Sequence, residues 1–418
     1  MQYGLIGEKL SHSFSKEIHE SLASYTYELC EIARENLADF LQKREFCAIN
    51  VTMPYKKEVI PFLDEVSPVA SELLAVNCIV NKNGKLYGYN TDYFGMRDLI
   101  LRSHIDISGK KVLILGTGGT SRTSSLVCRN LCAGEIIRVS RSANEGALSY
   151  EEAYEKHFDA DVIINTTPVG MYPNSYASPI NLDKFTNLCA VFDAVYNPLC
   201  TQLILDARSK KIHAEGGLYM LVSQAVHAVE LFIDAKFDEG KTDEIFNKVF
   251  KEKENIVLIG MPSSGKTTVG KILADNLGRE IVDLDDEIVK TIGCEIAEFF
   301  KTHSEMDFRD IETQITKEFS KKNGIIIATG GGCILRGENV SALRSNGRLY
   351  FLDRSLKNLI PTDSRPLASK VSDIENLYNK RYSIYLDACD KKIDGDLPPI
   401  DVANLIEKEF NKNENFSA

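Results

Sequence analysis

The sequence predicts an α/β protein that is built from parallel sheets and contains more than one domain. Two glycine-rich loops support this prediction, because each lies between an apolar, strand-like run and a helix-like segment. The first loop, 116–119, follows Val112-Leu113-Ile114-Leu115, and the second, 260–267, follows Ile256-Val257-Leu258-Ile259. Strand–loop–helix units connect parallel strands. The 418 residues suit two or three domains of about 100–200 residues each.

The composition is that of a globular protein, with 44% hydrophobic and 26% charged residues. A net charge of -11 argues against a general nucleic-acid binder. No apolar run approaches the roughly 20 residues that span a bilayer, and the N-terminal residues lack a signal-peptide pattern. We therefore predict a cytoplasmic protein without nucleic-acid or membrane partners. Ten cysteines occur without a Cys-x-x-Cys pair, so no zinc site is predicted.

The elements follow one another in an α/β order. Up to about residue 98, short apolar runs alternate with helical patterns. A βαβ unit then comprises 112–115, a helix over 121–131 and a strand over 136–139, and further strands are expected at 161–165 and 190–193. From Tyr219, apolar residues recur at helical spacing. The charged stretch 251–254 has no apolar face and is predicted to be a linker.

The first glycine loop predicts a dinucleotide site. Gly116, Gly118 and Gly119 follow a strand and open a helix, although Ser121 replaces the third glycine of the usual pattern. The next strand ends in Val139-Ser140-Arg141-Ser142, without the acid that binds the ribose hydroxyls of NAD. Because an arginine there can pair with a 2′-phosphate, Arg141 favours NADP over NAD.

Three polar clusters precede this loop, at 11–15, 50–56 and 90–92. Each alone is typical of a turn or helix cap. Together they offer hydroxyls, amides, a lysine and a carboxylate, which suit a polyhydroxylated anion.

These clusters, with 75–77, 116–122, 165–171, 193–201 and 217–224, resemble the shikimate dehydrogenase family over roughly residues 1–250. The resemblance implies that Lys56 and Asp92 form the catalytic pair that reduces 3-dehydroshikimate. A lysine ammonium can stabilise the oxyanion and donate a proton, and a carboxylate can hold the lysine. The resemblance also implies shikimate binding by Ser13, Ser15, Thr52, Asn77, Tyr196 and Gln224.

The second loop matches the Walker A pattern and predicts an ATP site. Its binding residues are Gly260, Gly265, Lys266, Thr267 and Thr268. Lys266 should reach the β- and γ-phosphates, and the Thr267 hydroxyl should coordinate Mg²⁺. Ile281–Asp285 is expected to be a strand that directs Asp283 and Asp285 to one side. Asp283 would support Mg²⁺, and Asp285 would accept a proton from an attacking hydroxyl.

The segments that follow indicate the phosphoryl acceptor. Glu305, Arg309 and Glu312 share one helix face, which alone is typical of a solvated salt-bridge ladder. A strand over 325–329 then ends at Gly330-Gly331-Gly332, where the backbone can approach a ligand closely.

This second set resembles the shikimate kinase family over roughly residues 255–418. The resemblance places Asp285, Arg309, the glycines 330–332 and Arg381 around shikimate, and Arg365 near the ATP phosphates as a lid residue. Two arginines suit bidentate recognition of a carboxylate. Relatives often carry another arginine just upstream of the lid, where this chain has Leu359-Ile360-Pro361.

The predicted fold is thus a two-lobed dehydrogenase with a Rossmann-like NADP domain, followed by a P-loop kinase domain with a central parallel sheet. The expected limits are 1–102 with 217–250 for the substrate domain, 103–216 for the NADP domain, 251–254 for the linker and 255–418 for the kinase. The implied function is bifunctional and belongs to the shikimate pathway of chorismate and aromatic amino acid biosynthesis. NADPH reduces 3-dehydroshikimate to shikimate, and ATP with Mg²⁺ then yields shikimate 3-phosphate.

Two alternatives remain open at this point. One is a regulator that binds the metabolites without turnover, although Lys56, Asp92, Lys266 and Asp285 are all present. The other is an enzyme of the same folds with other substrates, such as quinate with NAD or another kinase acceptor. The sequence does not indicate an oligomeric state.

Overall fold

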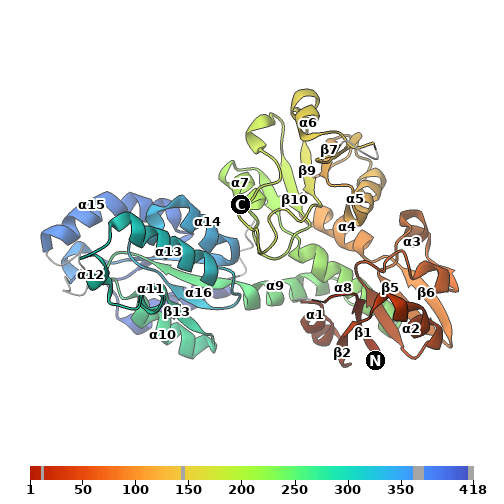
Figure 1. Ribbon diagram of the computed structural model, residues 1–418, viewed down its shortest axis with the longest axis horizontal. Coiled ribbons are helices and arrows are strands. Elements are labelled where there is room, and N and C mark those ends of the chain that lie inside the picture. Colours follow the sequence, from red (N-terminus) through yellow and green to blue (C-terminus); the bar gives the residue numbers. More distant parts are fainter. Residues whose placement is uncertain (11–13, 143–145, 361–370, 413–418) are drawn as a thin grey trace. The chain divides into compact units, whose positions relative to one another are not determined.

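The computed structural model describes residues 1–10, 14–142, 146–360 and 371–412. Their contacts divide into two compact units (Figure 1). Unit 1 holds Met1–Asn197 and Asp206–Val249, and unit 2 holds Pro198–Leu205 and the described residues from Phe250 onward. Within the described ranges, no helix is long and apolar enough to cross a membrane.

Unit 1 begins with a six-stranded mixed sheet in the order β2-β1-β3-β5-β6-β4. β1, β2 and β3 are parallel, whereas β5 is antiparallel to both of its neighbours. The strands are β1 Tyr3–Gly7, β2 Tyr27–Glu31, β3 Ala48–Val51, β4 Glu65–Val66, β5 Cys78–Lys82 and β6 Lys85–Tyr89. The helices of this lobe are α1 Ser15–Leu22, α2 Leu37–Lys43, α3 Pro68–Leu73 and α4 Asp92–Arg102. Ile6, Ile49 and Ile79 lie in its fully buried core.

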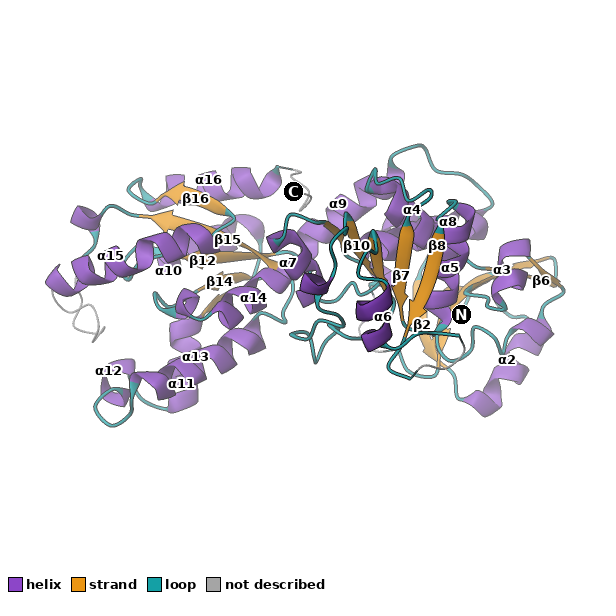
Figure 2. Cartoon of the chain, turned by 90° about the horizontal axis from the view of Figure 1, so that it is seen from above, coloured by secondary structure: helices purple, strands orange, loops and turns teal. Residues whose placement is uncertain are grey.

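The second sheet of unit 1 is entirely parallel, in the order β11-β10-β9-β7-β8 (Figure 2). Its strands are β7 Lys111–Leu115, β8 Glu135–Val139, β9 Val162–Asn165, β10 Ala190–Asp193 and β11 His213–Glu215. Its helices are α5 Gly119–Asn130, α6 Tyr150–Lys156 and α7 Gln202–Ser209. The predicted βαβ unit is therefore confirmed, with the glycine loop between β7 and α5. This loop lies where the strand order reverses, between β7 and β9, which is the usual ligand position in such sheets.

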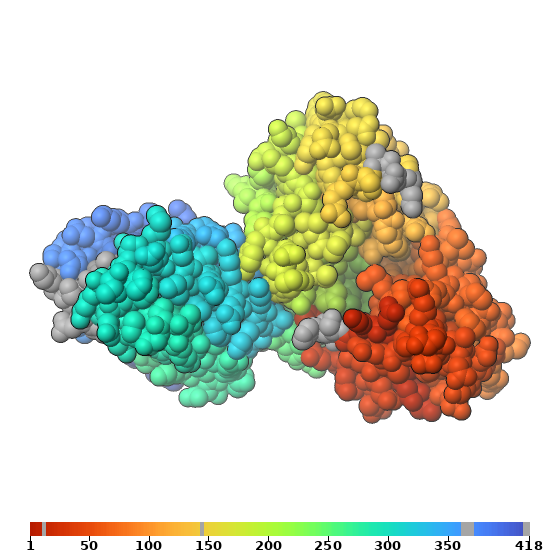
Figure 3. Space-filling model, viewed as in Figure 1, coloured from red at the N-terminus to blue at the C-terminus, as the bar shows by residue number. Residues whose placement is uncertain are grey.

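The two lobes of unit 1 meet at α4 and α8, Leu218–Ile233. The helices cross closely at Gly95, where an added β-carbon would lie 2.5 Å from the Met220 carbonyl oxygen. In Figure 3 the lobe of the first sheet is coloured mainly red to orange, and the lobe of the second sheet is coloured mainly yellow to green. The crossing brings the start of α4 beside the middle of α8.

Unit 2 contains a parallel five-stranded sheet in the order β13-β14-β12-β15-β16. The strands are β12 Asn255–Ile259, β13 Ile281–Asp283, β14 Ile326–Ala328, β15 Gly347–Asp353 and β16 Lys391–Asp394. The helices are α10 Lys266–Leu277, α11 Leu284–Ile292, α12 Ile296–Phe299, α13 Glu305–Phe319, α14 Gly337–Asn346, α15 Val371–Ala388 and α16 Pro399–Asn411. On β12, Val257 and Ile259 join one buried cluster, and Ile256 and Leu258 join another. Both sheet faces are thus covered, as a parallel sheet requires.

The described residues also form five short 3₁₀ helices, at 34–36, 60–62, 182–184, 333–335 and 356–358. The predicted α/β class is confirmed.

The charged stretch 251–254, predicted to be a linker, contains one buried side chain. Residues 251–253 form the last turn of α9, Lys241–Lys253. Glu254 is only 2% exposed and pairs with Arg348 through two contacts of 3.1 and 3.2 Å. The stretch has no apolar face, as expected, but its last residue is buried through an ion pair, and the linker stays a prediction.

The predicted domain limits stay a prediction, and the contacts differ from them in one respect. Residues 198–205, placed in the NADP domain, group with unit 2. Within that unit, the Leu199 amide donates to Asn346 Oδ1 and the Cys200 amide donates to the Ser345 carbonyl, both at 2.8 Å.

Candidate active sites

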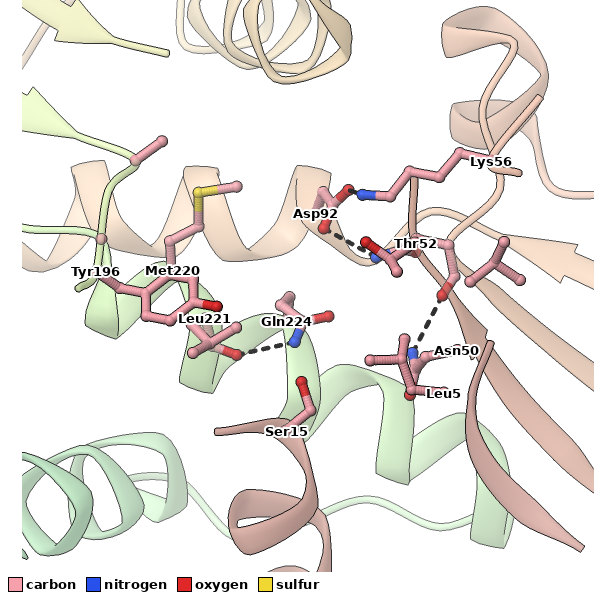
Figure 4. Close-up of a pocket in the computed structure, with 14 residues that line it drawn as sticks. Leu5, Ser15, Asn50, Thr52, Lys56, Asp92, Tyr196, Met220, Leu221 and Gln224 are labelled. Atoms are coloured by element: carbon pink, nitrogen blue, oxygen red, sulfur yellow. Dashed lines mark hydrogen bonds and ion pairs between the residues drawn. The ribbon is translucent and has the colours of Figure 1, made fainter. Parts of the chain in front are cut away.

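Unit 1 contains a cavity of about 220 Å³ between its lobes (Figure 4). Strand ends of the first sheet, the start of α4 and the first half of α8 supply most of its wall. The lining residues are Leu5, Ser15, Asn50, Val51, Thr52, Lys56, Asn77, Asp92, Ala194, Tyr196, Gly217, Met220, Leu221 and Gln224. All the described catalytic and shikimate-binding residues predicted for the dehydrogenase are among them.

Lys56 and Asp92 form an ion pair in this cavity. Lys56 Nζ lies 2.6 Å from Asp92 Oδ2, and the two side chains are 32% and 21% exposed. Asp92 is the first residue of α4, where a carboxylate is favoured by the helix dipole. The pair is therefore half-buried and open to a ligand.

Asn77 fixes the second oxygen of the same carboxylate. Its Nδ2 donates to Asp92 Oδ1 at 2.9 Å and to Thr91 Oγ1 at 3.0 Å, and its Oδ1 accepts from the Thr91 amide at 2.7 Å. Thr91 is fully buried, and its hydroxyl lies 3.3 Å from Gln224 Oε1. This network joins β5, α4 and α8, and Thr91 was absent from the predicted site residues.

Neutral polar groups share the rest of the wall with apolar side chains. Ser15, Thr52 and Gln224 come from α1, the end of β3 and α8. Tyr196 closes the side near the second lobe, and its ring lies 5.5 Å from that of Phe14. Burial raises the pKa of Tyr196, so its hydroxyl stays protonated at neutral pH. The predicted residue Ser13 lies outside the described residues.

The first glycine loop has room for a ligand. Gly116 adopts φ +109°, which favours glycine, and β-carbons added to Gly118 or Gly119 would meet nothing within 4 Å. The Gly116 amide donates to the Val139 carbonyl at 2.7 Å, so the loop lies beside the end of β8. Arg141 follows two residues later and is exposed. An open loop, a helix N-terminus and a nearby arginine fit a dinucleotide with a 2′-phosphate.

The phosphate loop of unit 2 surrounds its own lysine. Gly260, Ser263 and Gly265 have φ values of +151°, +65° and +94°. Lys266 is 7% exposed, and its Nζ donates to the Gly260 and Met261 carbonyls at 2.9 Å each. This places an ammonium where the loop would hold phosphate oxygens. Thr268 is exposed on the first turn of α10.

The donors next to the loop fit Mg²⁺. Thr267 Oγ1 donates to Asp283 Oδ2 at 2.6 Å, so a hydroxyl and a carboxylate oxygen stand together. Magnesium is usually held by few protein oxygens together with water and phosphate oxygens. Accordingly, the described parts of the chain contain no cluster of three or more histidine, cysteine or acidic side chains that could hold a metal.

The expected strand over 281–285 is wrong in its second half. β13 ends at Asp283, which caps α11 by accepting the Asp285 amide at 3.0 Å. Asp285 therefore lies in the first helical turn. It still reaches the glycine turn after β14, since a β-carbon on Gly330 would lie 2.5 Å from Asp285 Oδ1.

Two arginines lie near this glycine turn. Arg309 is 8% exposed and pairs with Glu312 at 2.7 Å and with Glu305 at 3.1 Å. A β-carbon on Gly332 would lie 2.2 Å from Arg309 Nη1. The alternative that this helix face is a solvent-exposed salt-bridge ladder is wrong, because Glu312 is only 2% exposed. Sequence reasoning did not select Glu312 as a site residue, although its spacing from Arg309 gave a signal.

Arg381 is the second arginine. It is 6% exposed, and its Nη1 donates to the neutral Gly331 carbonyl at 2.9 Å. Burial and the nearby charge of Arg309 hold the pKa of Arg381 below its ordinary value. No carboxylate of the described residues pairs with it. A ligand carboxylate would therefore meet a buried guanidinium that has no direct ion-pair contact among the described residues, with Glu305 and Glu312 further away. The predicted lid residue Arg365 lies outside the described residues.

Fold and geometry together define a two-lobed dinucleotide-dependent enzyme joined to a P-loop phosphotransferase. Residues 5–79 match the family model "Shikimate dehydrogenase substrate binding domain", and residues 262–411 match "Shikimate kinase". The NADP(+)-type shikimate dehydrogenase of Clostridium beijerinckii is 35% identical over 267 residues, 60% of this chain and 99% of that protein. The chain therefore belongs to the shikimate dehydrogenase family and carries a shikimate kinase domain behind it.

Two solved structures resemble the first 60% of the chain. A chorismate mutase/shikimate 5-dehydrogenase fusion protein from Clostridium acetobutylicum is 35% identical with a TM-score of 0.56, covering 59% of this chain and 96% of that one. Shikimate 5-dehydrogenase from Thermus thermophilus, in complex with NADP(H) and shikimate, is 29% identical with a TM-score of 0.53, covering 59% and 99%.

Proposed function

We propose that this chain catalyses two consecutive steps of the shikimate pathway: NADPH-dependent reduction of 3-dehydroshikimate, then ATP-dependent phosphorylation of the resulting shikimate. The observation that carries the proposal is the Lys56–Asp92 pair among Ser15, Thr52 and Gln224. That cavity offers one proton donor among neutral hydrogen-bonding groups, as the ketone of a polyhydroxylated acid requires. The product of this site is the acceptor expected at the second.

In the first step, NADPH supplies the hydride when it is bound. The hydride adds to the ketone carbon, and negative charge develops on the oxygen. The Lys56 ammonium stabilises that oxygen and donates its proton to it. Asp92 holds the ammonium through Oδ2, and Asn77 holds the other oxygen of Asp92. Solvent then reprotonates Lys56.

The remaining residues orient the two ligands. Ser15, Thr52, Gln224 and Tyr196 bind the hydroxyls and carboxylate of the substrate. Ser13 is assigned the same role by family resemblance.

The cofactor is held at the other lobe. Gly116, Gly118 and Gly119 admit the pyrophosphate of NADPH, and Arg141 pairs with its 2′-phosphate. Because no acid ends β8, no carboxylate stands there to accept hydrogen bonds from the ribose hydroxyls, as one does in an NAD enzyme.

In the second step, the shikimate hydroxyl attacks the γ-phosphorus of ATP. Asp285 accepts the hydroxyl proton, the new O–P bond forms, and the bond to ADP breaks. Lys266 and the loop amides bind the phosphates, with Gly260, Gly265 and Thr268 framing the loop and Arg365 assigned to the lid. Thr267 and Asp283 would hold Mg²⁺, which supplies charge neutralisation on the phosphates. Arg309 and Arg381 bind the shikimate carboxylate beside the glycines 330–332.

A one-pot assay tests both assignments. Purified protein is mixed with limiting 3-dehydroshikimate, NADPH, ATP and Mg²⁺, and NADPH absorbance and ADP release are followed together. We expect ADP to appear only after NADPH consumption starts and to reach an equal final yield. NADPH consumption without ADP, even with added shikimate, would contradict the kinase assignment. No change in either signal would contradict the dehydrogenase assignment, and it would contradict both assignments if added shikimate also gave no ADP.

Both reactions use water-soluble substrates and nucleotides, so we place the enzyme in the cytoplasm. Its partners are these small molecules.

A further inference from the structure

One backbone carbonyl in unit 2 accepts hydrogen bonds from two side chains of the same helix. Arg381 Nη1 donates to the Gly331 carbonyl at 2.9 Å, and Tyr385 Oη donates to the same oxygen at 2.5 Å. The two donors are one turn apart on α15, at positions i and i+4 that share a helix face. Gly331 is thereby tied to α15 twice.

The glycine turn that carries this carbonyl contacts a different functional group at each position. An added β-carbon on Gly330 would meet Asp285, one on Gly332 would meet Arg309, and one on Gly331 would lie 2.8 Å from Pro262 Cδ. Pro262 belongs to the phosphate loop. The Gly331 peptide therefore lies between the acceptor groups and the phosphate loop.

Tyr385 is suited to fix this peptide in place. It is fully buried, and its ring stacks on Phe351 of β15 with centroids 4.9 Å apart and planes inclined by 8°. The ring is therefore held by the central sheet, and the hydroxyl is a rigid donor. Burial raises the pKa of Tyr385, which keeps that donor protonated.

Arg381 uses only part of its guanidinium group at the same carbonyl. A guanidinium has five N–H donors, and the bond to Gly331 engages one nitrogen. The bond orients the guanidinium plane and leaves the other nitrogens for a carboxylate. Its orientation depends on where the Gly331 oxygen lies, and Tyr385 sets that position.

We propose that Tyr385 is a positioning residue of the shikimate site, which acts through the Gly331 carbonyl to orient Arg381 for the acceptor carboxylate. This inference rests on the proposed kinase function. Tyr385 does not touch the acceptor. Its contribution is therefore to acceptor affinity and not to the phosphoryl-transfer chemistry.

The test compares Tyr385→Phe with Tyr382→Phe in the full chain. Tyr382 lies on the same helix, and its hydroxyl donates to Asp353 Oδ2 at 3.0 Å, away from the glycine turn. Both variants lose one hydroxyl and keep the ring. In Tyr385→Phe the Gly331 carbonyl retains its bond from Arg381, so no acceptor is left unpaired and folding should be preserved.

We expect Tyr385→Phe to weaken shikimate binding about fivefold to tenfold, as loss of one net hydrogen bond allows. Titration calorimetry with shikimate and with ADP measures the two ligands separately. The dissociation constant for ADP, the kinase kcat and the dehydrogenase activity should each change less than about twofold. Tyr382→Phe should leave shikimate binding unchanged.

A double-mutant cycle with Arg381→Lys sharpens the test. If Tyr385 acts through Arg381, the double variant should bind shikimate about as weakly as Arg381→Lys alone. Fully additive losses would overturn the proposal, as would equal losses in the two tyrosine variants or no loss in Tyr385→Phe. If wild-type protein fails to bind or phosphorylate shikimate, the proposed kinase function itself is wrong.

Discussion

The two candidate sites differ in the partner of a key cation. In unit 1, Lys56 and Asp92 are already paired at 2.6 Å in a cavity open to ligand. In unit 2, Arg381 is buried against a neutral carbonyl and has no described carboxylate partner. The first site should act on the ketone group of its substrate through an ion pair that is already formed, and the second should bind a carboxylate through buried guanidinium groups and backbone shape. The two activities should therefore be lost through different kinds of substitution.

The largest effect is expected from Lys56→Ala. Removing the ammonium takes away both oxyanion stabilisation and the proton donor, so ketone reduction should fall about 10³-fold or more. Phosphorylation of supplied shikimate should stay within about twofold of wild type, because its groups lie in unit 2. Separate initial-rate assays of the two reactions measure this.

Lys57→Ala is the matched control. Lys57 follows directly in the chain and is exposed, and it does not line the cavity. It should leave both activities unchanged. A folded Lys56→Ala protein that loses both activities would contradict independent sites.

Alanine substitutions at one glycine of each site should have different structural consequences. In Gly331→Ala, the methyl would lie 2.8 Å from the Pro262 ring, so the turn must shift. Because small misplacements in a reacting site are costly, we expect kinase kcat/KM to fall about 100-fold. In Gly118→Ala, the methyl would meet nothing within 4 Å. That variant should fold normally and raise the KM for NADPH about tenfold, because the cofactor must approach this backbone closely.

Steady-state kinetics of both reactions, with melting curves, decide the comparison. Each variant should spare the other activity. If Gly331→Ala kept wild-type kinase activity, the glycine turn would not shape the acceptor site. If Gly118→Ala left NADPH kinetics unchanged, the first loop would not hold the pyrophosphate.

Local patterns allowed much of this molecule to be predicted. The strands before both glycine loops and the polar clusters of the first cavity follow from short-range sequence. The strand predicted over 281–285 is wrong in its second half, because the alternation of side chains along a strand does not continue past the start of α11. Asp283 is typical of an N-cap, and the acidic residues 285–287 are typical of a first helical turn. This signal could have located the boundary between β13 and α11.

Long-range pairings could not be predicted in the same way. Glu254 looked solvated because its partner Arg348 lies 94 residues away. Tyr385 and Gly331 are 54 residues apart. Thr91 is part of a recognised polar cluster, yet only the fold shows that its hydroxyl faces Asn77 and Gln224. Such contacts depend on strand order and helix crossing, which no local pattern encodes.

The smallest expected effect concerns pH, and it again separates the units. In unit 1, burial lowers the pKa of His19 to about 3, and its ring stacks on Tyr27 with centroids 4.0 Å apart. The folded state binds fewer protons than the unfolded state between pH 3 and the ordinary value of 6.5. Stability from this group is therefore lost as pH falls below 6.5, by about 2 kcal/mol at pH 5.

In unit 2, burial raises the pKa of Glu254 to about 7, although Arg348 favours its charged form. Here the folded state holds a proton that the unfolded state has released above its ordinary value of 4.5. Stability from Glu254 is therefore full below pH 4.5 and falls, by about 3 kcal/mol in all, as pH rises to about 7. The two buried groups give pH slopes of opposite sign.

Scanning calorimetry between pH 5 and 7 measures both slopes. The transition raised by ADP belongs to unit 2, because a ligand stabilises the unit that binds it. Relative to wild type, Glu254→Gln should stabilise this transition increasingly as pH rises, by several degrees at about 2–4 °C per kcal/mol. His19→Asn should flatten the pH dependence of the other transition. If Glu254→Gln shifted its transition equally at every pH, Glu254 would not titrate in this range, and the buried pair with Arg348 would be ionised throughout.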